Sequence, residues 1–203
     1  MVVIIDYGMG NLMSVYKAVL SLKTKAVVSG NYKIIERADK IILPGVGHFG
    51  KAVRELKKRG IFSVIKNKIK GKTLFLGICL GMQLLFKHSE EDHGVNGFDV
   101  VEGKVKKFPS KRLTIPHMGW NSIKKKISVK TPLLLSGIKN GSFFYFAHSY
   151  YCKPEKKENI LTATDYGIEF ASSLHKDNIW AVQFHPEKSQ RLGLKLLNNF
   201  LSL

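Results

Sequence analysis

An apolar strand leads directly into a helix within residues 73–81, TLFLGICLG. Gly77 and Gly81 lie two positions before and two after Cys79, where a tight turn requires glycine because side chains would collide as the strand reverses into the helix. This pattern is typical of a nucleophile elbow, with cysteine in place of serine. The start of a helix and a nearby imidazolium would both favour the thiolate form of Cys79. The alternative is that Cys79 is a small buried thiol at the end of a strand.

Strands and helices alternate through the first 86 residues. We expect strands at Val2–Ile5, Lys40–Leu43 and Thr73–Ile78, and helices from Asn11, the expected N-cap, to Leu22 and at Phe49–Lys58, Ile61–Lys70 and Leu80–Phe86. Such alternation is typical of parallel strands joined by right-handed crossovers.

After His88 the pattern changes to short strands with few helices. Strands are expected at Val100–Phe108, Asn121–Lys125, Phe143–Phe146, Ile160–Thr164, Phe170–Leu174 and Ile179–Phe184, and a last helix at about Lys188–Leu201. With no internal repeat or linker, the chain is expected to form one domain over residues 1–203. The predicted fold is α/β: a doubly wound, mostly parallel sheet flanked by helices, with antiparallel strands added in the C-terminal half.

Basic residues outnumber acidic residues by 33 to 15, which gives a formal net charge of +18. A nucleic-acid partner is nevertheless not expected, because few of the basic residues are arginine and the densest lysine groups lack interleaved aromatic side chains on which bases stack. We interpret the lysines as a solvated surface. The positive field could also steer docking onto an acidic protein partner.

Hydropathy and cysteine content indicate a cytoplasmic protein. No apolar run approaches the roughly 18 residues of a membrane span, and the apolar start of the chain lacks the basic segment and cleavage site of a signal peptide. Cys79 and Cys152 are too few for a disulfide framework, and a reducing compartment keeps both as thiols.

A second candidate element is His185-Pro186-Glu187, just beyond an expected strand. Pro186 disfavours helix at His185, and in an extended chain residues i and i+2 face the same side, so Glu187 could accept a hydrogen bond from one imidazole nitrogen. The other nitrogen would remain for a thiol, in the manner of a catalytic triad. The alternative is a satisfied histidine at a strand end with an exposed glutamate.

The third element is the glycine loop Pro44–Gly47, which follows another expected strand. Acyl transfer needs two N–H donors for the oxyanion, and the N–H of Leu80 could pair with that of Val46 or of Gly47. The alternative is an ordinary turn between strand and helix. Active sites of open α/β sheets form beyond the carboxyl ends of the strands, so all three elements are expected to meet there.

Metal and nucleotide sites are not expected from these residues. Cys79, His185 and Glu187 are possible ligands, but no Cys-x-x-Cys or His-x-x-x-His spacing supports a metal, and zinc would occupy the thiolate that the elbow presents. The glycine loop lacks the Gly-Lys-Ser/Thr of a phosphate-binding loop. We therefore expect no metal and no cofactor.

Together these motifs resemble class I glutamine amidotransferases, and among them the glutaminase subunits of imidazole glycerol phosphate synthase. The resemblance is carried in order along nearly the whole chain by Asp6–Asn11 (DYGMGN), Pro44–Gly50 (PGVGHFG), Gly77–Phe86 (GICLGMQLLF), Pro116–Asn121 (PHMGWN) and Gln183–Ser189 (QFHPEKS). It implies a class I glutamine amidotransferase fold.

The resemblance implies hydrolysis of L-glutamine to glutamate and ammonia. Cys79 would attack the side-chain amide and form a thioester, His185 would move the protons, and Glu187 would orient His185. The family's substrate contacts match Gln83, Glu91, His148, Ser149 and Tyr150, with Glu91 pairing with the substrate ammonium and the last three acting through main-chain groups. Gln83 lies one helical turn after Cys79, on the same face.

The resemblance also implies a partner, a (β/α)8 cyclase subunit that forms a heterodimer with the glutaminase and uses its ammonia in histidine biosynthesis. Asn11 and Trp120 match positions at the docking face, although Trp120 could equally lie in the core. Cys152 matches no motif and is interpreted as a structural thiol. Because glycines flank Val46, its peptide should reorient easily, and we expect the free subunit to be nearly inactive.

Three other functions remain open on the sequence. The first is a paralogous glutaminase that supplies ammonia for amination of a surface-polysaccharide sugar, which no residue excludes. The second is a non-catalytic docking module, against which the Cys79, His185 and Glu187 set speaks. The third is a cysteine hydrolase or peptidase of related architecture, which would not need the docking stretches.

Overall fold

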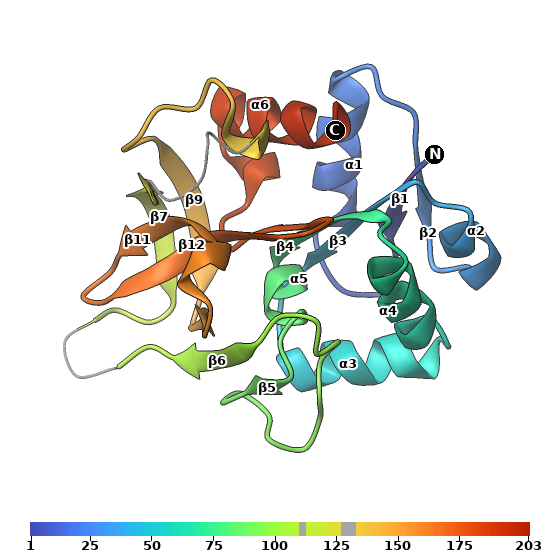
Figure 1. Ribbon diagram of the computed structural model, residues 1–203, viewed down its shortest axis with the longest axis horizontal. Helices are drawn as coiled ribbons and strands as arrows, with labels where there is room; N and C mark the ends of the chain where they lie inside the picture. Colours follow the sequence, from blue (N-terminus) through green and yellow to red (C-terminus); the bar gives the residue numbers. More distant parts are fainter. Residues whose placement is uncertain (110–112, 127–132) are drawn as a thin grey trace.

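The central sheet has eight strands in the order β2-β1-β3-β4-β13-β12-β11-β8 within residues 1–109, 113–126 and 133–203, which the computed structural model describes (Figure 1). Its strands are β1 (Val2–Ile5), β2 (Ala26–Ser29), β3 (Lys40–Gly45), β4 (Leu74–Cys79), β8 (Lys124–Lys125), β11 (Ile160–Asp165), β12 (Glu169–Lys176) and β13 (Ile179–Val182). The strands from β2 to β13 are parallel, whereas β12, β11 and β8 are added antiparallel. The predicted fold is confirmed.

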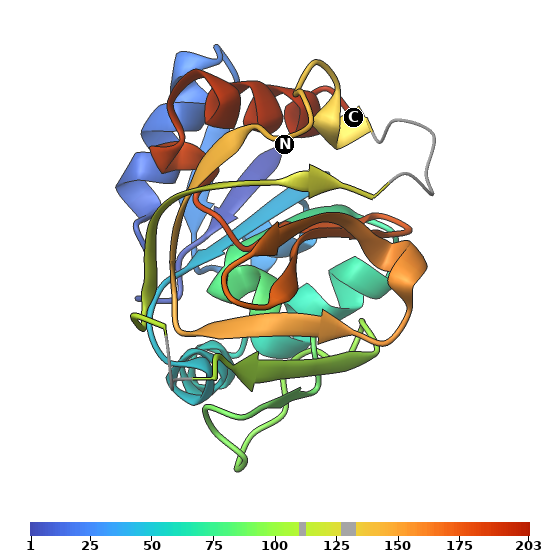
Figure 2. The same ribbon diagram turned by 90° about the vertical axis from the view of Figure 1, so that its left-hand side faces the viewer.

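Two smaller sheets lie beside the antiparallel end. The first contains β5 (His88–Ser89), β6 (Gly103–Lys107) and β10 (Tyr150–Pro154), and the second is an antiparallel ribbon of β7 (His117–Ser122) and β9 (Phe143–His148). Figure 2 turns this side of the molecule toward the viewer, with β11 and β12 in orange. Sequence reasoning did not predict β2, β5 or β10.

Helices cover both faces of the parallel strands (Figure 1). The helices are α1 (Leu12–Ser21), α2 (Tyr32–Glu36), α3 (Phe49–Lys58), α4 (Phe62–Lys70), α5 (Leu80–Gln83) and α6 (Gln190–Leu201). Apolar side chains of α1 and α6 pack with Val2 and Ile4, and those of α2, α3 and α4 pack with Val3 and Ile5. Successive β1 residues therefore enter opposite cores, as expected for a strand buried on both faces. Among the described residues, no helix has the length and apolar character of a membrane span.

Two expectations about helices need correction. The helix predicted over Leu80–Phe86 ends at Gln83, because the carbonyls of Leu84 and Leu85 accept hydrogen bonds from the segment 98–101 instead of continuing the helix. Asn11 occupies the N-cap position of α1, but its side chain makes no capping hydrogen bond. The first-turn hydrogen bond runs from the N–H of Val15 to the backbone carbonyl of Asn11.

Candidate active site

Cys79 ends β4, and α5 begins at the next residue. Its backbone has φ 54° and ψ −107°, a conformation that costs a non-glycine residue energy and is concentrated at functional sites. A Cβ atom on Gly77 would lie 2.7 Å from the carbonyl oxygen of Gly81, and one on Gly81 would collide with the carbonyl oxygen of Leu43. The elbow therefore needs both glycines, as predicted. The helix that starts beside Cys79 is short, with only 4 residues.

His185 and Glu187 form a buried pair, with Nδ1 and Oε1 2.8 Å apart and side chains only 2% and 1% exposed. The predicted extended geometry is wrong, because Pro186–Lys188 is a 3₁₀ turn. The turn begins at Pro186 and brings the Glu187 carboxylate within hydrogen-bond distance of the His185 imidazole. The alternative of an exposed glutamate is excluded by its burial.

The second ring nitrogen of His185, Nε2, has no hydrogen-bond partner among the described residues. Burial disfavours a charged imidazole, but the nearby Cys79 sulfur and Glu187 outweigh it and raise the pKa of His185 to about 10. A nitrogen in this state can hold the proton that a cysteine nucleophile gives up.

Two polar groups contact the Cys79 sulfur. The side-chain amide Nε2 of Gln183 lies 3.6 Å from Sγ, and the carbonyl oxygen of Ala147 lies 3.8 Å from it. No role had been assigned to Gln183, although it stands in one of the quoted motifs. Its contact depends on the pairing of β4 with β13, which no local sequence signal encodes.

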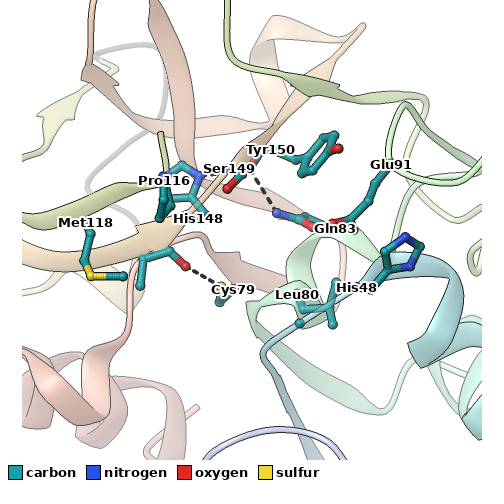
Figure 3. Close-up of a pocket in the computed structure, with 12 residues that line it drawn as sticks. His48, Cys79, Leu80, Gln83, Glu91, Pro116, Met118, His148, Ser149 and Tyr150 are labelled. Atoms are coloured by element: carbon teal, nitrogen blue, oxygen red, sulfur yellow. Dashed lines mark hydrogen bonds between the residues drawn. The ribbon is translucent and has the colours of Figure 1, made fainter. Parts of the chain in front are cut away.

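A cavity of about 370 Å³ lies over the elbow and brings together the expected substrate residues (Figure 3). It is lined by Gly47, His48, Cys79, Leu80, Gln83, Glu91, Pro116, Met118, Ala147, His148, Ser149 and Tyr150. This volume is in the range of small-molecule sites. Of the expected oxyanion donors, Leu80 and Gly47 line the cavity, whereas Val46 does not and its side chain faces solvent.

Two side chains in the cavity wall have fixed partners. Gln83 Nε2 donates to the carbonyl oxygen of Tyr150 at 3.0 Å, and Glu91 Oε2 accepts from the N–H of Phe49 at 2.6 Å, at the start of α3. Glu91 is therefore held at the cavity and is not a freely solvated acid. Helix N-termini stabilise carboxylates in this way.

A buried pair of histidines, His117 and His148, lies at the cavity, and His148 is part of its lining. Burial lowers the pKa of His117 to about 4 and that of His148 to about 3. Sequence reasoning gave His148 a substrate role and His117 none. No local sequence signal marks the pair, because only the register of β7 with β9 places the two residues opposite each other.

The remaining predicted residues lie outside the cavity. Trp120 is 47% exposed on β7, so the core alternative is wrong, and Asn11 is half-buried beside α1. Cys152 is buried on β10 and unpaired, and burial raises the pKa of its thiol. This fits the expected structural thiol. In the part of the chain that the structure covers, no cluster of three or more His, Cys, Asp or Glu side chains could hold a metal ion.

Comparisons with known proteins agree with this arrangement. The family model "Glutamine amidotransferase class-I" matches residues 3–203. Subunit HisH of imidazole glycerol phosphate synthase from Methanocaldococcus jannaschii is 47% identical, with 100% of both chains covered. The subunit of that name from Aquifex aeolicus is 48% identical over 98% of this chain and 94% of its own.

Solved structures share the fold at much lower identity. A glutamine amidotransferase superposes with a TM-score of 0.77 at 17% identity, covering 100% of this chain and 98% of its own. The glutaminase domain of Trypanosoma brucei CTPS superposes with a TM-score of 0.66 at 15% identity, over 99% and 93%. With the family model and the close relatives, the chain belongs to the class I glutamine amidotransferases and, within them, to the HisH subunits of imidazole glycerol phosphate synthase.

Proposed function

We propose that this chain is the glutaminase of imidazole glycerol phosphate synthase and hydrolyses L-glutamine to glutamate and ammonia. The observation that carries the proposal is the cavity at the elbow. There Cys79 lies in a strained conformation. Its sulfur interacts with His185, whose other ring nitrogen is fixed by Glu187. The work is done by one domain that spans residues 1–203.

The reaction begins when the Cys79 sulfur, whose proton His185 Nε2 already holds, attacks the amide carbon of glutamine. The N–H of Leu80 and one N–H of the 46–47 segment stabilise the oxyanion. His185 returns the proton to the leaving nitrogen, and ammonia departs as the thioester forms. Water then attacks the thioester with His185 as base, which releases glutamate and leaves the proton on His185 beside the freed sulfur.

Substrate recognition falls to the opposite wall of the cavity. Glu91 supplies a carboxylate for the substrate ammonium, and main-chain groups of residues 148–150 hold the substrate carboxylate. Gln83 uses its Nε2 hydrogens on protein acceptors, so its amide oxygen is the atom left for substrate. These groups have the charges and donors that an amino acid requires.

The ammonia passes to a (β/α)8 cyclase subunit, with which the chain forms a heterodimer in histidine biosynthesis. The complex converts a phosphoribulosyl-formimino intermediate to imidazole glycerol phosphate and aminoimidazole carboxamide ribotide. Asn11 and the exposed Trp120 belong to the docking face. The HisH name of close relatives favours this acceptor over a polysaccharide sugar. The unpaired Cys79 and Cys152 fit a reducing compartment, and we place the reaction in the cytoplasm.

The free subunit is nearly inactive in this proposal. The Val46 peptide lies between Gly45 and Gly47, and Gly47 has φ +105°, so the loop that completes the oxyanion hole is easily reoriented. Docking aligns it. Glutamate release by the isolated chain as fast as in the complex would contradict this step.

The test compares wild type with Cys79→Ala in complex with the candidate cyclase. We expect glutamate release from the wild-type complex only, while both complexes form imidazole glycerol phosphate when ammonia is added. A Cys79→Ala complex that still hydrolyses glutamine would show that Cys79 is not the nucleophile.

A further inference from the structure

A second hydrogen-bonded group, separate from Cys79, His185 and Glu187, reaches the cavity from the β7–β9 ribbon. His117 on β7 pairs in register with His148 on β9, and Nδ1 of the first lies 3.0 Å from Nε2 of the second. Both side chains are buried, at 3% and 5% exposure. A contact between two imidazoles requires one donor and one acceptor, so the direction of this hydrogen bond depends on what each ring bonds at its other nitrogen.

Asn121 fixes that direction at the outer end. Its Oδ1 accepts from the N–H of Ser122 at 2.8 Å, so its Nδ2 must be the donor to the carbonyl oxygen of Asp165 at 2.9 Å and to His117 Nε2 at 3.3 Å. His117 Nε2 is therefore an acceptor, and the proton of the neutral ring is on Nδ1.

Tyr150 fixes the same direction at the inner end. His148 Nδ1 lies 2.8 Å from the carbonyl oxygen of Tyr150, which can only accept, so His148 carries its proton on Nδ1 and accepts from His117 at Nε2. Backbone groups at both ends of this hydrogen-bond chain thus require the same tautomer of both rings, with the proton on Nδ1. Burial keeps both rings neutral and so maintains this arrangement of hydrogen bonds.

The hydrogen-bond chain continues from the Tyr150 carbonyl to the Cys79 sulfur. The same carbonyl accepts from Gln83 Nε2 at 3.0 Å, and Gln83 Nε2 also donates to Gln183 Oε1 at 3.2 Å. This orients the amide of Gln183 so that its Nε2 faces Cys79 Sγ as a donor at 3.6 Å. The sulfur of Cys79 therefore has a hydrogen-bond donor of fixed direction in contact with it.

We propose that Asn121, His117 and His148 are positioning residues, whose directed hydrogen-bond chain orients Gln83 and Gln183 and thereby presents a donor to the Cys79 sulfur. The proposal rests on the function proposed above, since it takes Cys79 as the nucleophile. Asn121 directly follows the exposed Trp120, so the chain links the docking face to the reacting atom.

The tautomers are read directly from the ring nitrogens of the full chain, uniformly labelled with ¹⁵N, by imidazole NMR near neutral pH. We expect His117 and His148 to be neutral with the proton on Nδ1. A proton on Nε2 of either ring, or a charged ring, overturns the proposal. This measurement needs neither partner nor activity, so it stands apart from the test of the function.

Two substitutions at His117 test the effect on the reaction in the complex with the cyclase. His117→Asn keeps an N–H donor in the place of Nδ1, whereas His117→Leu removes it. We expect glutaminase kcat/KM to fall about tenfold in His117→Leu and to stay within about twofold of wild type in His117→Asn. Equal kcat/KM in the two variants overturns the proposal, whether both are reduced or both unchanged.

A matched control uses His175, another histidine whose pKa burial lowers, which stacks on Trp180 and bonds the Asp177 carbonyl away from the cavity. We expect His175→Leu to leave kcat/KM unchanged. Ammonia-driven synthesis by every complex checks assembly. If the wild-type complex releases no glutamate, the proposed function fails, while the NMR result still decides the tautomers.

Discussion

The N-terminal and the C-terminal halves of the chain contribute differently to the site. The N-terminal half presents Cys79 through backbone geometry, with a positive φ and two glycines that no side chain could replace. The C-terminal half supplies polar side chains at the site, namely His185, Glu187 and Gln183, and hydrogen bonds hold them in place. The position of Cys79 thus depends on steric fit, whereas the groups around it depend on polar contacts.

The two halves meet where β4 pairs with β13. Ile78 lies opposite Val182, so the next residues of the two strands, Cys79 and Gln183, come out side by side. A parallel pair places both carboxyl ends at one edge, which is why residues 104 positions apart come into contact. Changes to the polar side chains from the C-terminal half should therefore affect mainly chemistry, and changes to the glycines of the elbow should affect mainly stability.

The largest effect is expected for His185→Asn, which removes the base contributed by the C-terminal half. Glutaminase kcat in the complex should fall at least about a thousandfold, because proton transfer to and from the reacting groups is lost. Steady-state glutamate release measures it. A fall smaller than about tenfold would mean that another group moves the proton.

Glu187→Gln should cost about a hundredfold to ten-thousandfold in kcat, because the amide cannot stabilise the imidazolium. The substitution should also change the pH dependence of stability. The pKa of His185 is raised from 6.5 to about 10 in the folded chain. Its contribution to the free energy of unfolding is therefore complete below about pH 6.5 and is lost as the pH rises toward 10.

Urea unfolding near pH 6.5 and near pH 10 tests the direction of this change in the free energy of unfolding. The wild-type free energy of unfolding should fall more steeply between pH 6.5 and 10 than that of Glu187→Gln, which carries the same lysines and tyrosines. Parallel curves for the two proteins would contradict the assigned coupling of Glu187 with His185.

Gly81→Ala tests the steric half of the comparison. Its Cβ would collide with the carbonyl oxygen of Leu43 on β3, so the chain should lose roughly 1–3 kcal/mol of unfolding free energy. Gly94→Ala is the control, because a Cβ there meets only the flexible side chain of Asp92 at 3.3 Å. Urea midpoints that shift equally in both variants would refute the steric account of the elbow.

The smallest effect on the chain itself is expected for Trp120→Ala. Because this side chain is exposed, its loss should leave the unfolding free energy within about 0.5 kcal/mol of wild type. Affinity for the cyclase should nevertheless fall at least about tenfold, since a large aromatic side chain at an interface is a typical hot spot. Titration calorimetry measures the affinity. An unchanged Kd would show that Trp120 is not part of the docking face.

Local features were predictable and long-range ones were not. The Cys79 turn followed from its two glycines, and the His185–Glu187 pair followed from close spacing, although the 3₁₀ turn replaced the expected extended chain. The strand β2 was missed because Ala26–Ser29 is short and only Ser29 is buried, so it gives little apolar signal.

The contacts that complete the site depend on tertiary pairing. Gln183 reaches the sulfur only because β13 lies beside β4, and His117 reaches His148 only through the β7–β9 register. The shortness of α5 has the same origin, since segment 98–101 takes the carbonyls that a longer helix would use. None of these partners is near in sequence.

The central claim is that the glutamyl group of glutamine forms a thioester with Cys79. His185 and Glu187, from the C-terminal half of the chain, act on the reacting groups. The direct test is acid quenching of the complex during turnover, followed by peptide mapping by mass spectrometry. A glutamyl group on the Cys79 peptide, absent from Cys79→Ala, is the predicted result. A glutamyl adduct at another residue would contradict the account. So would turnover without any adduct, provided that the thioester forms faster than it is hydrolysed.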